Sequence, residues 1–309
     1  LNLSANVLGL DNAATPMGIK AMQDLQTLNP RPEVASNAQI LFLVLNTSAV
    51  TLFPVTILLY RAQMGAEDPA AVFVPILIAT SCSTLAGLLI TAWVQRIRLW
   101  DTVVLGFIGG AFAALLALVG WFSTLGADEL QRQSSLISNF LIIALIILFL
   151  LVAHRKAVNV YEVFIEGAKS GFETAIGIIP YLLAMLVAIG VFRASGALDV
   201  LLDGLRAIVA AGGWDARWVD ALPTALMKPL SGSGARAMMI ETMNNFGVDS
   251  FQGRLAATVQ GSTETTFYVL AVYFGSVGIR HARHALACGL AADFAGITAA
   301  IAVAYWFYG

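Results

Sequence analysis

The chain has 309 residues, of which 59% are hydrophobic and 12% are Asp, Glu, Lys or Arg, whereas soluble domains average roughly 45–50% and roughly 25%. Its 17 basic and 19 acidic residues are too few to form the charged shell of a water-soluble globule of this size. The mean hydropathy of +0.81 therefore predicts an all-α integral membrane protein. The formal net charge of -2 argues against a nucleic-acid partner.

Apolar runs that could cross about 30 Å of hydrocarbon recur along the chain. We predict six crossings and a less uniform seventh at 255–277. The six are 38–60, 71–93, 102–122, 136–153, 172–192 and 285–308. Segments 3–25 and 221–245 are apolar but interrupted by Gly, Pro, Asn and Ser, so we expect re-entrant hairpins there. The patterns at 157–170 and 197–211 predict helices at the membrane interface or packed across the bundle.

Basic residues in short loops indicate which loops face the cytoplasm. Arg and Lys gather in the loops at 96–98, 155–169 and 280–283, whereas the loop at 123–135 is mainly acidic. We therefore place the three basic loops on the cytoplasmic side and the acidic loop on the opposite side. With this assignment, the crossing at 38–60 runs outward and the crossing at 255–277 runs inward.

An internal repeat occurs at an offset of about 215 residues. The polar step 46–48 (Asn-Thr-Ser) aligns with 261–263 (Gly-Ser-Thr), and 84–87 (Thr-Leu-Ala-Gly) aligns with 293–296 (Asp-Phe-Ala-Gly). Because the orientation rule makes the two copies run in opposite senses, we predict inverted repeats with re-entrant hairpins and broken helices, a plan common in secondary transporters. Chance likeness between two apolar helices is the alternative.

Two parts of the chain resemble known families. Residues 155–309 resemble spore maturation protein B through Pro229-Leu-Ser-Gly-Ser-Gly234, the run 260–278 and Ala291-Ala-Asp-Phe-Ala-Gly296. Residues 1–98 resemble the C-terminal half of spore maturation protein A through the run 9–22 and Leu43-Val-Leu-Asn46-Thr-Ser48. The chain thus resembles a fused form of the family that carries the nucleoside-recognition, or gate, domain. This resemblance implies a multi-pass protein of the bacterial inner membrane and favours movement of a small solute.

The repeat and the resemblance together predict three domains. They are a first gate-like repeat at 1–98, connecting transmembrane helices at 99–154 and a second gate-like repeat at 155–309. The second copy is preceded by a module that the first copy lacks, so about 80 to 120 further residues are expected before Leu1.

Polar residues at membrane depth are the candidate substrate contacts. They are Asp11, Asn12, Asn46, Thr47, Ser48, Ser231, Ser233, Gly261, Ser262, Thr263 and Glu264. The loop at 231–234 lacks the preceding strand and the Lys-Ser/Thr ending of soluble nucleotide-binding loops. At a re-entrant tip its backbone N–H groups would instead face a polar or anionic group. Close packing of small residues is the alternative for the tips.

Two carboxylates lie within the predicted crossings. An ionisable side chain there costs about 2.5–3.5 kcal/mol on insertion scales, so it usually faces a cavity or a partner. Glu264 and Asp293 are therefore candidates for coupling to H+ or Na+. The alternative for Glu264 is a structural carboxylate that caps a broken helix or pairs with Lys228 or Arg236. His281 and His284 lie in a basic loop, and no metal or cofactor is expected.

The leading functional hypothesis is a secondary transporter or permease of a small polar metabolite, with a nucleoside-like solute as one candidate, bound between the two inverted repeats. The alternative is a non-transporting membrane assembly or regulatory protein that keeps a gate-like scaffold. No catalytic constellation points to an enzyme. The expected partners are the lipid bilayer, the solute and the coupling ion, and homo-oligomerisation is left open.

Overall fold

The computed structural model describes residues 2–7, 9, 11–48, 50–97, 102–169, 172, 176, 183, 187, 191 and 194–309. Helices dominate these ranges, as predicted, and the single β contact recorded among them is a bridge between Val34 and His281. In chain order the elements are α1 (Asn2–Val7), α2 (Asp11–Thr27), α3 (Asn37–Thr47), α4 (Val55–Gln63), η1 (Pro69–Val72), α5 (Phe73–Gln95), α6 (Thr102–Ser123), α7 (Ala127–Arg155), α9 (Ala197–Ala211), η2 (Arg217–Ala221), α10 (Leu222–Met227), α11 (Gly232–Phe246), α12 (Phe251–Ser262), α13 (Thr266–Gly275) and α14 (Ala285–Tyr308).

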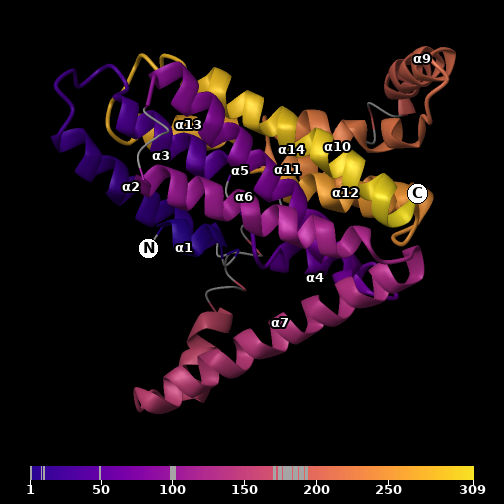
Figure 1. Ribbon diagram of the computed structural model, residues 1–309, viewed down its shortest axis with the longest axis horizontal. Coiled ribbons are helices and arrows are strands. Elements are labelled where there is room, and N and C mark those ends of the chain that lie inside the picture. The colour runs from indigo at the N-terminus through magenta and orange to yellow at the C-terminus, as the bar shows by residue number, and fades with distance from the viewer. Residues whose placement is uncertain are drawn as a thin grey trace.

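Two sets of helices, α1–α5 and α10–α14, form the body of the molecule, and α7 and α9 lie at its edges (Figure 1). In each set a short helix precedes a longer one, a third helix ends at a break, and a short and then a long helix follow. The sets interleave, because α13 packs against α3 while α12 packs against α4 and α5. Residues far apart in the sequence are therefore neighbours at the centre of the fold.

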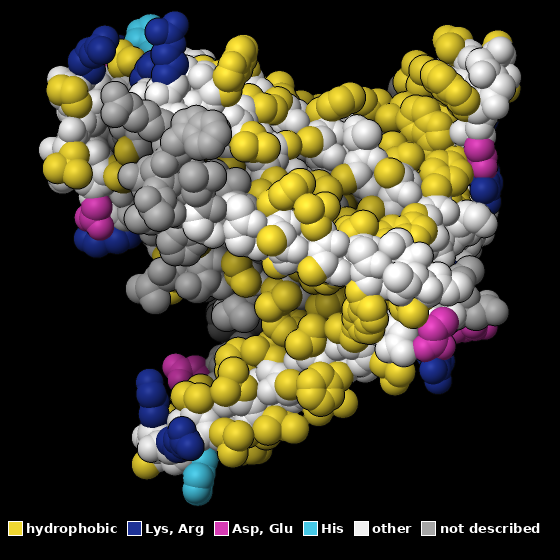
Figure 2. Space-filling model, viewed as in Figure 1, with side chains coloured by type: hydrophobic (Ala, Val, Ile, Leu, Met, Phe, Trp, Pro, Cys, Tyr) yellow, Lys and Arg dark blue, Asp and Glu magenta, His cyan; other side chains and the backbone are white. Residues whose placement is uncertain are grey.

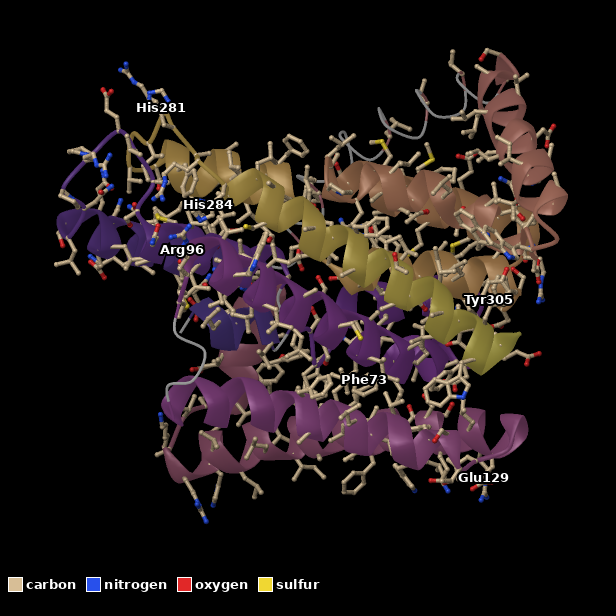
Figure 3. The ribbon with its side chains drawn as sticks, turned by 45° about the horizontal axis from the view of Figure 1, so that its top comes forward. Phe73, Arg96, Glu129, His281, His284 and Tyr305 are labelled. Carbon is tan, nitrogen blue, oxygen red and sulfur yellow. The ribbon has the colours of Figure 1, made fainter. Side chains whose placement is uncertain are left out.

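The long helices α5 and α14 pack side by side in opposite directions. Gln95 at the end of α5 lies 3.1 Å, Nε2 to Nε2, from His284 at the start of α14, and Figure 3 shows Arg96 beside His284 at one end of the pair. Close approach requires small residues. A Cβ at Gly87 would lie 2.9 Å from the Val44 side chain, and a Cβ at Gly296 would lie 2.6 Å from that of Thr263.

The segment at 38–60, predicted as a crossing, is divided into two helices and is therefore one of the broken helices of the fold. The α3 helix ends at Thr47 and α4 begins at Val55. Pro54 precedes α4 and has no N–H to continue a helical ladder, while the Ser48 hydroxyl donates to the carbonyl of Val44 at 2.7 Å. The segment at 255–277 is broken as well, between Ser262 and Thr266.

Three predicted crossings coincide with helices long and apolar enough to span a membrane: Pro69–Gln95, Arg132–Arg155 and Ala285–Tyr308. Hydrophobic side chains cover the middle of the face in Figure 2, and charged side chains gather toward its ends. On α7, Phe140 is 71% exposed, which suits a lipid-facing helix. The structure thus describes a helical membrane protein.

The remaining predicted segments have mixed outcomes. The α6 helix covers the predicted crossing at 102–122, and α9 has the predicted bounds of 197–211. Most of 172–192 lies outside the described residues. The segments at 3–25 and 221–245 are each divided into more than one helix, with breaks around Gly9 and Pro229, whereas Pro16 lies inside α2.

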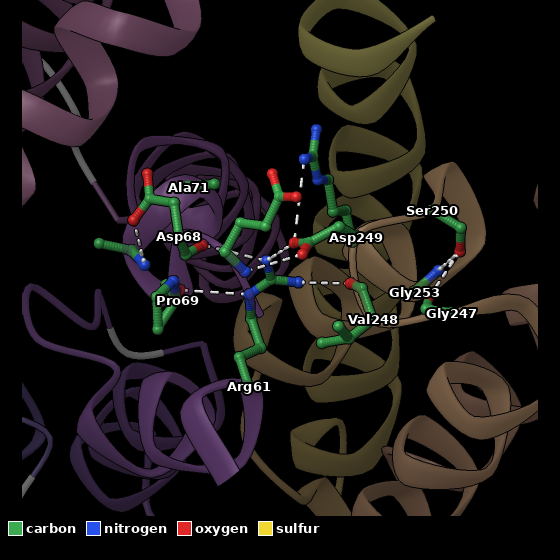
Figure 4. A network of polar contacts seen from close by, with 12 residues as sticks. Arg61, Asp68, Pro69, Ala71, Gly247, Val248, Asp249, Ser250 and Gly253 are labelled. Carbon is green, nitrogen blue, oxygen red and sulfur yellow. Dashed lines mark hydrogen bonds and ion pairs between the residues drawn. The ribbon is translucent and has the colours of Figure 1, made fainter. Parts of the chain in front are cut away.

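At one end of the molecule, the loop after α4 is joined to the loop before α12 by what we call the Arg61 cluster: Arg61, Asp68, Pro69, Val248 and Asp249 (Figure 4). The Arg61 side chain is fully buried and bonds to Asp249 at 2.7 Å. Its guanidinium also donates to the carbonyl oxygens of Val248 at 2.8 Å, Asp68 at 3.1 Å and Pro69 at 3.2 Å.

At the other end, the loop after α13 is joined to the loop before α3 by what we call the Arg283 cluster: Ala35, Asn37 and Arg283. The Arg283 guanidinium donates to the carbonyl of Ala35 at 2.9 Å and to Asn37 Oδ1 at 3.0 Å. The α3–α4 segment therefore runs from the Arg283 cluster to the Arg61 cluster, and α12–α13 runs the opposite way.

Candidate functional site

A cavity of about 580 Å³ lies between α1, α2 and α3 on one side and α11 and α13 on the other. Its polar lining combines amides, hydroxyls and two charged groups. These residues are Asn6, Thr15, Asn46, Ser231, Ser233, Arg236, Glu264, Thr265, Tyr268 and Tyr273. Such a volume and mixture of groups fall within the range of small-molecule sites, roughly 300–1,000 Å³.

The two helix breaks meet at the wall of this cavity. The backbone N–H of Glu264, in the break after α12, donates to the carbonyl of Thr47 at the end of α3, at 2.8 Å. The N–H of Phe267 at the start of α13 donates to the carbonyl of Pro229 at 3.0 Å. Backbone groups released by the breaks thus find partners in distant segments, as burial requires, and Glu264 is held at the cavity.

An amide network fixes the lining beside the first break. Asn46 Oδ1 accepts from Asn6 Nδ2 at 2.8 Å and from the Tyr273 hydroxyl at 3.3 Å. Its Nδ2 donates to the carbonyl of Phe42 at 2.8 Å. Asn46 is 2% exposed, so its polar groups depend on these contacts, and the network orients Asn6 and Tyr273 along the cavity.

The tip before α11 contributes a helix N-terminus. Ser231 is the N-cap of α11, and its hydroxyl accepts from the N–H of Gly234 at 3.1 Å. The next residue, Gly232, lies so close to α13 that a Cβ would be 2.9 Å from Thr265 Oγ1. This approach needs glycine and brings the positive end of the α11 dipole to the cavity.

A smaller cavity of about 80 Å³ adjoins the first. Both cavities are lined by Gly232, Arg236, Glu264 and Thr265. Lys228 and Gln260 line only the smaller one. We call this smaller cavity the annex.

The structure brings some of the predicted site residues together and places others behind the wall. Those that line either cavity are Asn46, Ser231, Ser233, Gly261 and Glu264. Those that are buried outside the lining are Thr47, Ser48, Ser262, Thr263 and Asp293. The side chains of Asp11 and Asn12 lie outside the described residues.

Asp293 is close to the second break although it is outside both linings. The carboxylate is 1% exposed, and its Oδ2 accepts from the Thr266 hydroxyl at 2.7 Å. On α5, Ser83 donates to the carbonyl of Ala292 at 2.9 Å, and Thr84 donates to the carbonyl of Ser48. Thr84 on α5 and Asp293 on α14 therefore each bond to the break of their own helix set, and the internal repeat aligns these two positions.

Several lining residues were not among the predicted contacts: Lys228, Arg236, Gln260, Tyr268 and Tyr273. Arg236 carries a signal in its spacing, since it lies four residues, or about one helical turn, after Gly232. Tyr268 likewise follows Glu264 by four residues. Tyr273 reaches the cavity through tertiary packing alone.

The histidine pair has a structural setting at the basic end of the molecule. His284 caps α14, and burial, together with the charge of Arg283, lowers its pKa. Among the residues the structure describes, no three His, Cys, Asp or Glu side chains gather closely enough to hold a metal ion.

Comparisons with known proteins agree with these features. The Gate family model, described as nucleoside recognition, matches residues 175–280. Spore maturation protein B of Bacillus subtilis (strain 168) is 49% identical over 154 residues, covering 50% of this chain and 85% of that protein. Spore maturation protein A of the same organism is 42% identical over 89 residues, covering 29% of this chain and 45% of that protein. No solved structure matches the chain.

The fold and the cavity define a helical membrane protein whose polar centre is formed by two broken helices. The extent of the match to spore maturation protein B then decides the family: the chain belongs to the spore maturation protein B family. It also carries a segment similar to spore maturation protein A, of which it spans less than half.

Proposed function

We propose that this protein is a secondary transporter that binds a small polar solute in the cavity between its two broken helices. The observation that carries the proposal is the hydrogen bond from the Glu264 N–H to the Thr47 carbonyl at 2.8 Å, at the wall of a 580 Å³ cavity. Broken helices that meet around a polar site near mid-membrane are a recurring feature of secondary transporters. A scaffold without a solute would have no need of so large a polar cavity.

The two helix sets are, in this proposal, inverted repeats. The order of helices is the same in α1–α5 and α10–α14, while α5 and α14 run in opposite directions. Equivalent glycines, Gly87 and Gly296, receive the side chains of the break in their own set. The Arg61 and Arg283 clusters join the sets at opposite ends, which suits alternate opening of the two sides.

The proposed arrangement in the membrane follows from the inverted repeats. We propose that the divided segments at 3–25 and 221–245 are re-entrant hairpins and that the chain is a multi-pass protein of the bacterial inner membrane. Figure 3 places Arg96 and His281 at one end of the molecule and Glu129 at the other. That separation supports a cytoplasmic location for the Arg283 cluster.

The proposed solute contacts are the polar side chains that line the cavity, with Asn46 and Glu264 at the two helix breaks. The description of the Gate model as nucleoside recognition makes nucleosides the first solutes to test. Glu264 is the proposed coupling carboxylate because it faces the cavity, and Asp293 is the second candidate because it bonds to the same break. The coupling ion in the proposal is H+ or Na+.

Proteoliposomes that contain the full protein test the proposal. Uptake of radiolabelled nucleosides is measured while the pH gradient and the Na+ gradient are varied separately. We expect Glu264→Gln to reduce the initial uptake rate at least about tenfold, a loss typical of a key site group, and Glu129→Gln, on the exposed part of α7, to leave it unchanged. Uptake that persists in Glu264→Gln would remove this carboxylate from the mechanism. Solute binding without any uptake would favour the non-transporting scaffold instead.

A further inference from the structure

The annex holds a buried ammonium group that forms no ion pair among the described residues. Lys228 is 5% exposed and lines the annex, and among the described residues its side chain has no ion pair or hydrogen bond. Its recorded interaction with Asp293 is longer-ranged. An isolated buried charge is costly, so the site favours an anion that can approach Lys228.

Two further side chains in the annex have unused polar atoms. Gln260 is 6% exposed, and its Oε1 has no hydrogen-bond partner. Arg236 has an unpartnered Nε, and its guanidinium lies 5.6 Å from the centroid of the Tyr60 ring. Buried polar atoms are nearly always satisfied in folded proteins, so these atoms point to a missing ligand or water.

Backbone groups add to the positive potential at the same place. Gly232, the first residue of the 15-residue helix α11, lines the annex, and the helix N-terminus presents its partial positive charge there. Glu264 is the single anionic side chain that lines the annex among the described residues, against Lys228 and Arg236. Asp293, which lies behind the lining, interacts with Lys228 at longer range, so it is the lining itself, together with the helix N-terminus, that carries the positive balance and favours an anion.

We infer that the annex binds the anionic group, a carboxylate or a phosphate, of the solute that occupies the larger cavity. Lys228 and Arg236 supply the countercharge, the Gln260 Nε2 can donate a hydrogen bond to the anion, and the unpartnered Gln260 Oε1 can accept one from a hydroxyl group of the solute. The volume of about 80 Å³ accommodates a group of this size and opens beside the residues that both cavities share. The inference rests on the proposed function and narrows its substrate class to organic anions.

Binding of small anions to the purified full-length protein in detergent tests this inference without any transport step. The probes are acetate and inorganic phosphate, each titrated at constant ionic strength against chloride, with acetamide as the neutral counterpart of acetate. Thermal stabilisation of the protein gives the dissociation constants. We expect at least one anion, but not acetamide, to bind.

Lys228→Met should weaken that binding at least about tenfold, Lys228→Arg should retain most of it, and the exposed control Lys156→Met should leave it unchanged. Gln260→Glu, which introduces a negative charge, provides a second test if Lys228→Met does not fold, and should abolish binding. Equal affinity in Lys228→Met or Gln260→Glu and wild type, or a failure of both acetate and phosphate to stabilise the protein more than acetamide does, would overturn the inference.

The same titration in bicelles with and without phosphatidylglycerol separates a soluble anion from a lipid headgroup. Unchanged affinity supports a soluble solute, whereas loss of binding in phosphatidylglycerol overturns that assignment. Anion binding without nucleoside or anion uptake would refute the transporter proposal and leave the anion site intact. Uptake of a neutral nucleoside without anion binding would refute the anion site and support the transporter proposal.

Discussion

Removal of the Arg61 guanidinium should destabilise the protein far more than removal of an exposed guanidinium. Arg61→Met keeps the aliphatic part of the side chain but deletes all four of its hydrogen bonds. These bonds join the loop after α4 to the carbonyl of Val248 and the carboxylate of Asp249, both in the loop before α12. The substitution therefore breaks a connection between the two helix sets.

The magnitude follows from burial. Arg61 is 0% exposed and Asp249 is 24% exposed, and breaking a buried pair by removing one partner costs about 3–5 kcal/mol. The matched control is Arg132→Met on α7. The Arg132 side chain is 66% exposed and bonds to Glu129 at 2.9 Å, and exposed pairs contribute about 0–1 kcal/mol.

Equilibrium unfolding in mixed micelles of a mild detergent and sodium dodecyl sulfate measures the difference. We expect the free energy of unfolding of Arg61→Met to fall about 3 kcal/mol or more below that of Arg132→Met. The double variant Arg61→Met/Asp249→Asn should recover part of the loss, because it removes the charge of a carboxylate that would otherwise keep only the more distant Arg254, at 3.8 Å, as its ion-pair partner. Equal stability of the two single variants would refute the assignment of Arg61 as a buried connection.

Two other substitutions probe the centre of the fold. Gly296→Ala should lower the free energy of unfolding by about 1–3 kcal/mol, because its Cβ would meet Thr263 and Ser83, whereas Gly109→Ala, which has open space around it, should be neutral or stabilising in the same micelle assay. Asn46→Leu should cost about 1–3 kcal/mol by leaving polar partners unpaired and should also weaken solute binding; a variant with wild-type stability and wild-type affinity would contradict the role of the amide network.

The sequence predicts the long helices well because hydropathy alone defines them. The predicted crossing at 285–308 has the bounds of α14, and that at 71–93 lies within two residues of α5 at each end. Hydropathy alone does not show where the helix in 38–60 breaks, because the average treats Pro54 as part of an apolar run. Its missing N–H prevents the helix from continuing, so the residue itself held the signal.

The residues of the candidate site likewise fall into those that the local sequence predicts and those that it does not. Asn46 and Glu264 could be predicted because polar groups in an apolar crossing are costly and need a cavity or a partner. Tyr273 could not be predicted, since its hydroxyl meets Asn46 across 227 positions of sequence. Lys228 and Gln260 are also single polar residues of one helix set, and the packing of α10 and α11 against α12 brings them to one annex.

The two end clusters differ in strength, and this difference has a consequence for the resting conformation. Backbone hydrogen bonds link the loops at the Arg283 end, but the exposed Arg283 guanidinium bonds only to uncharged acceptors, whereas Arg61 bonds to a carboxylate while fully buried. A two-sided carrier populates chiefly the state that keeps its stronger closure. If the protein is the proposed carrier and its basic loops lie in the cytoplasm, it should rest inward-facing without solute, with its periplasmic side shut.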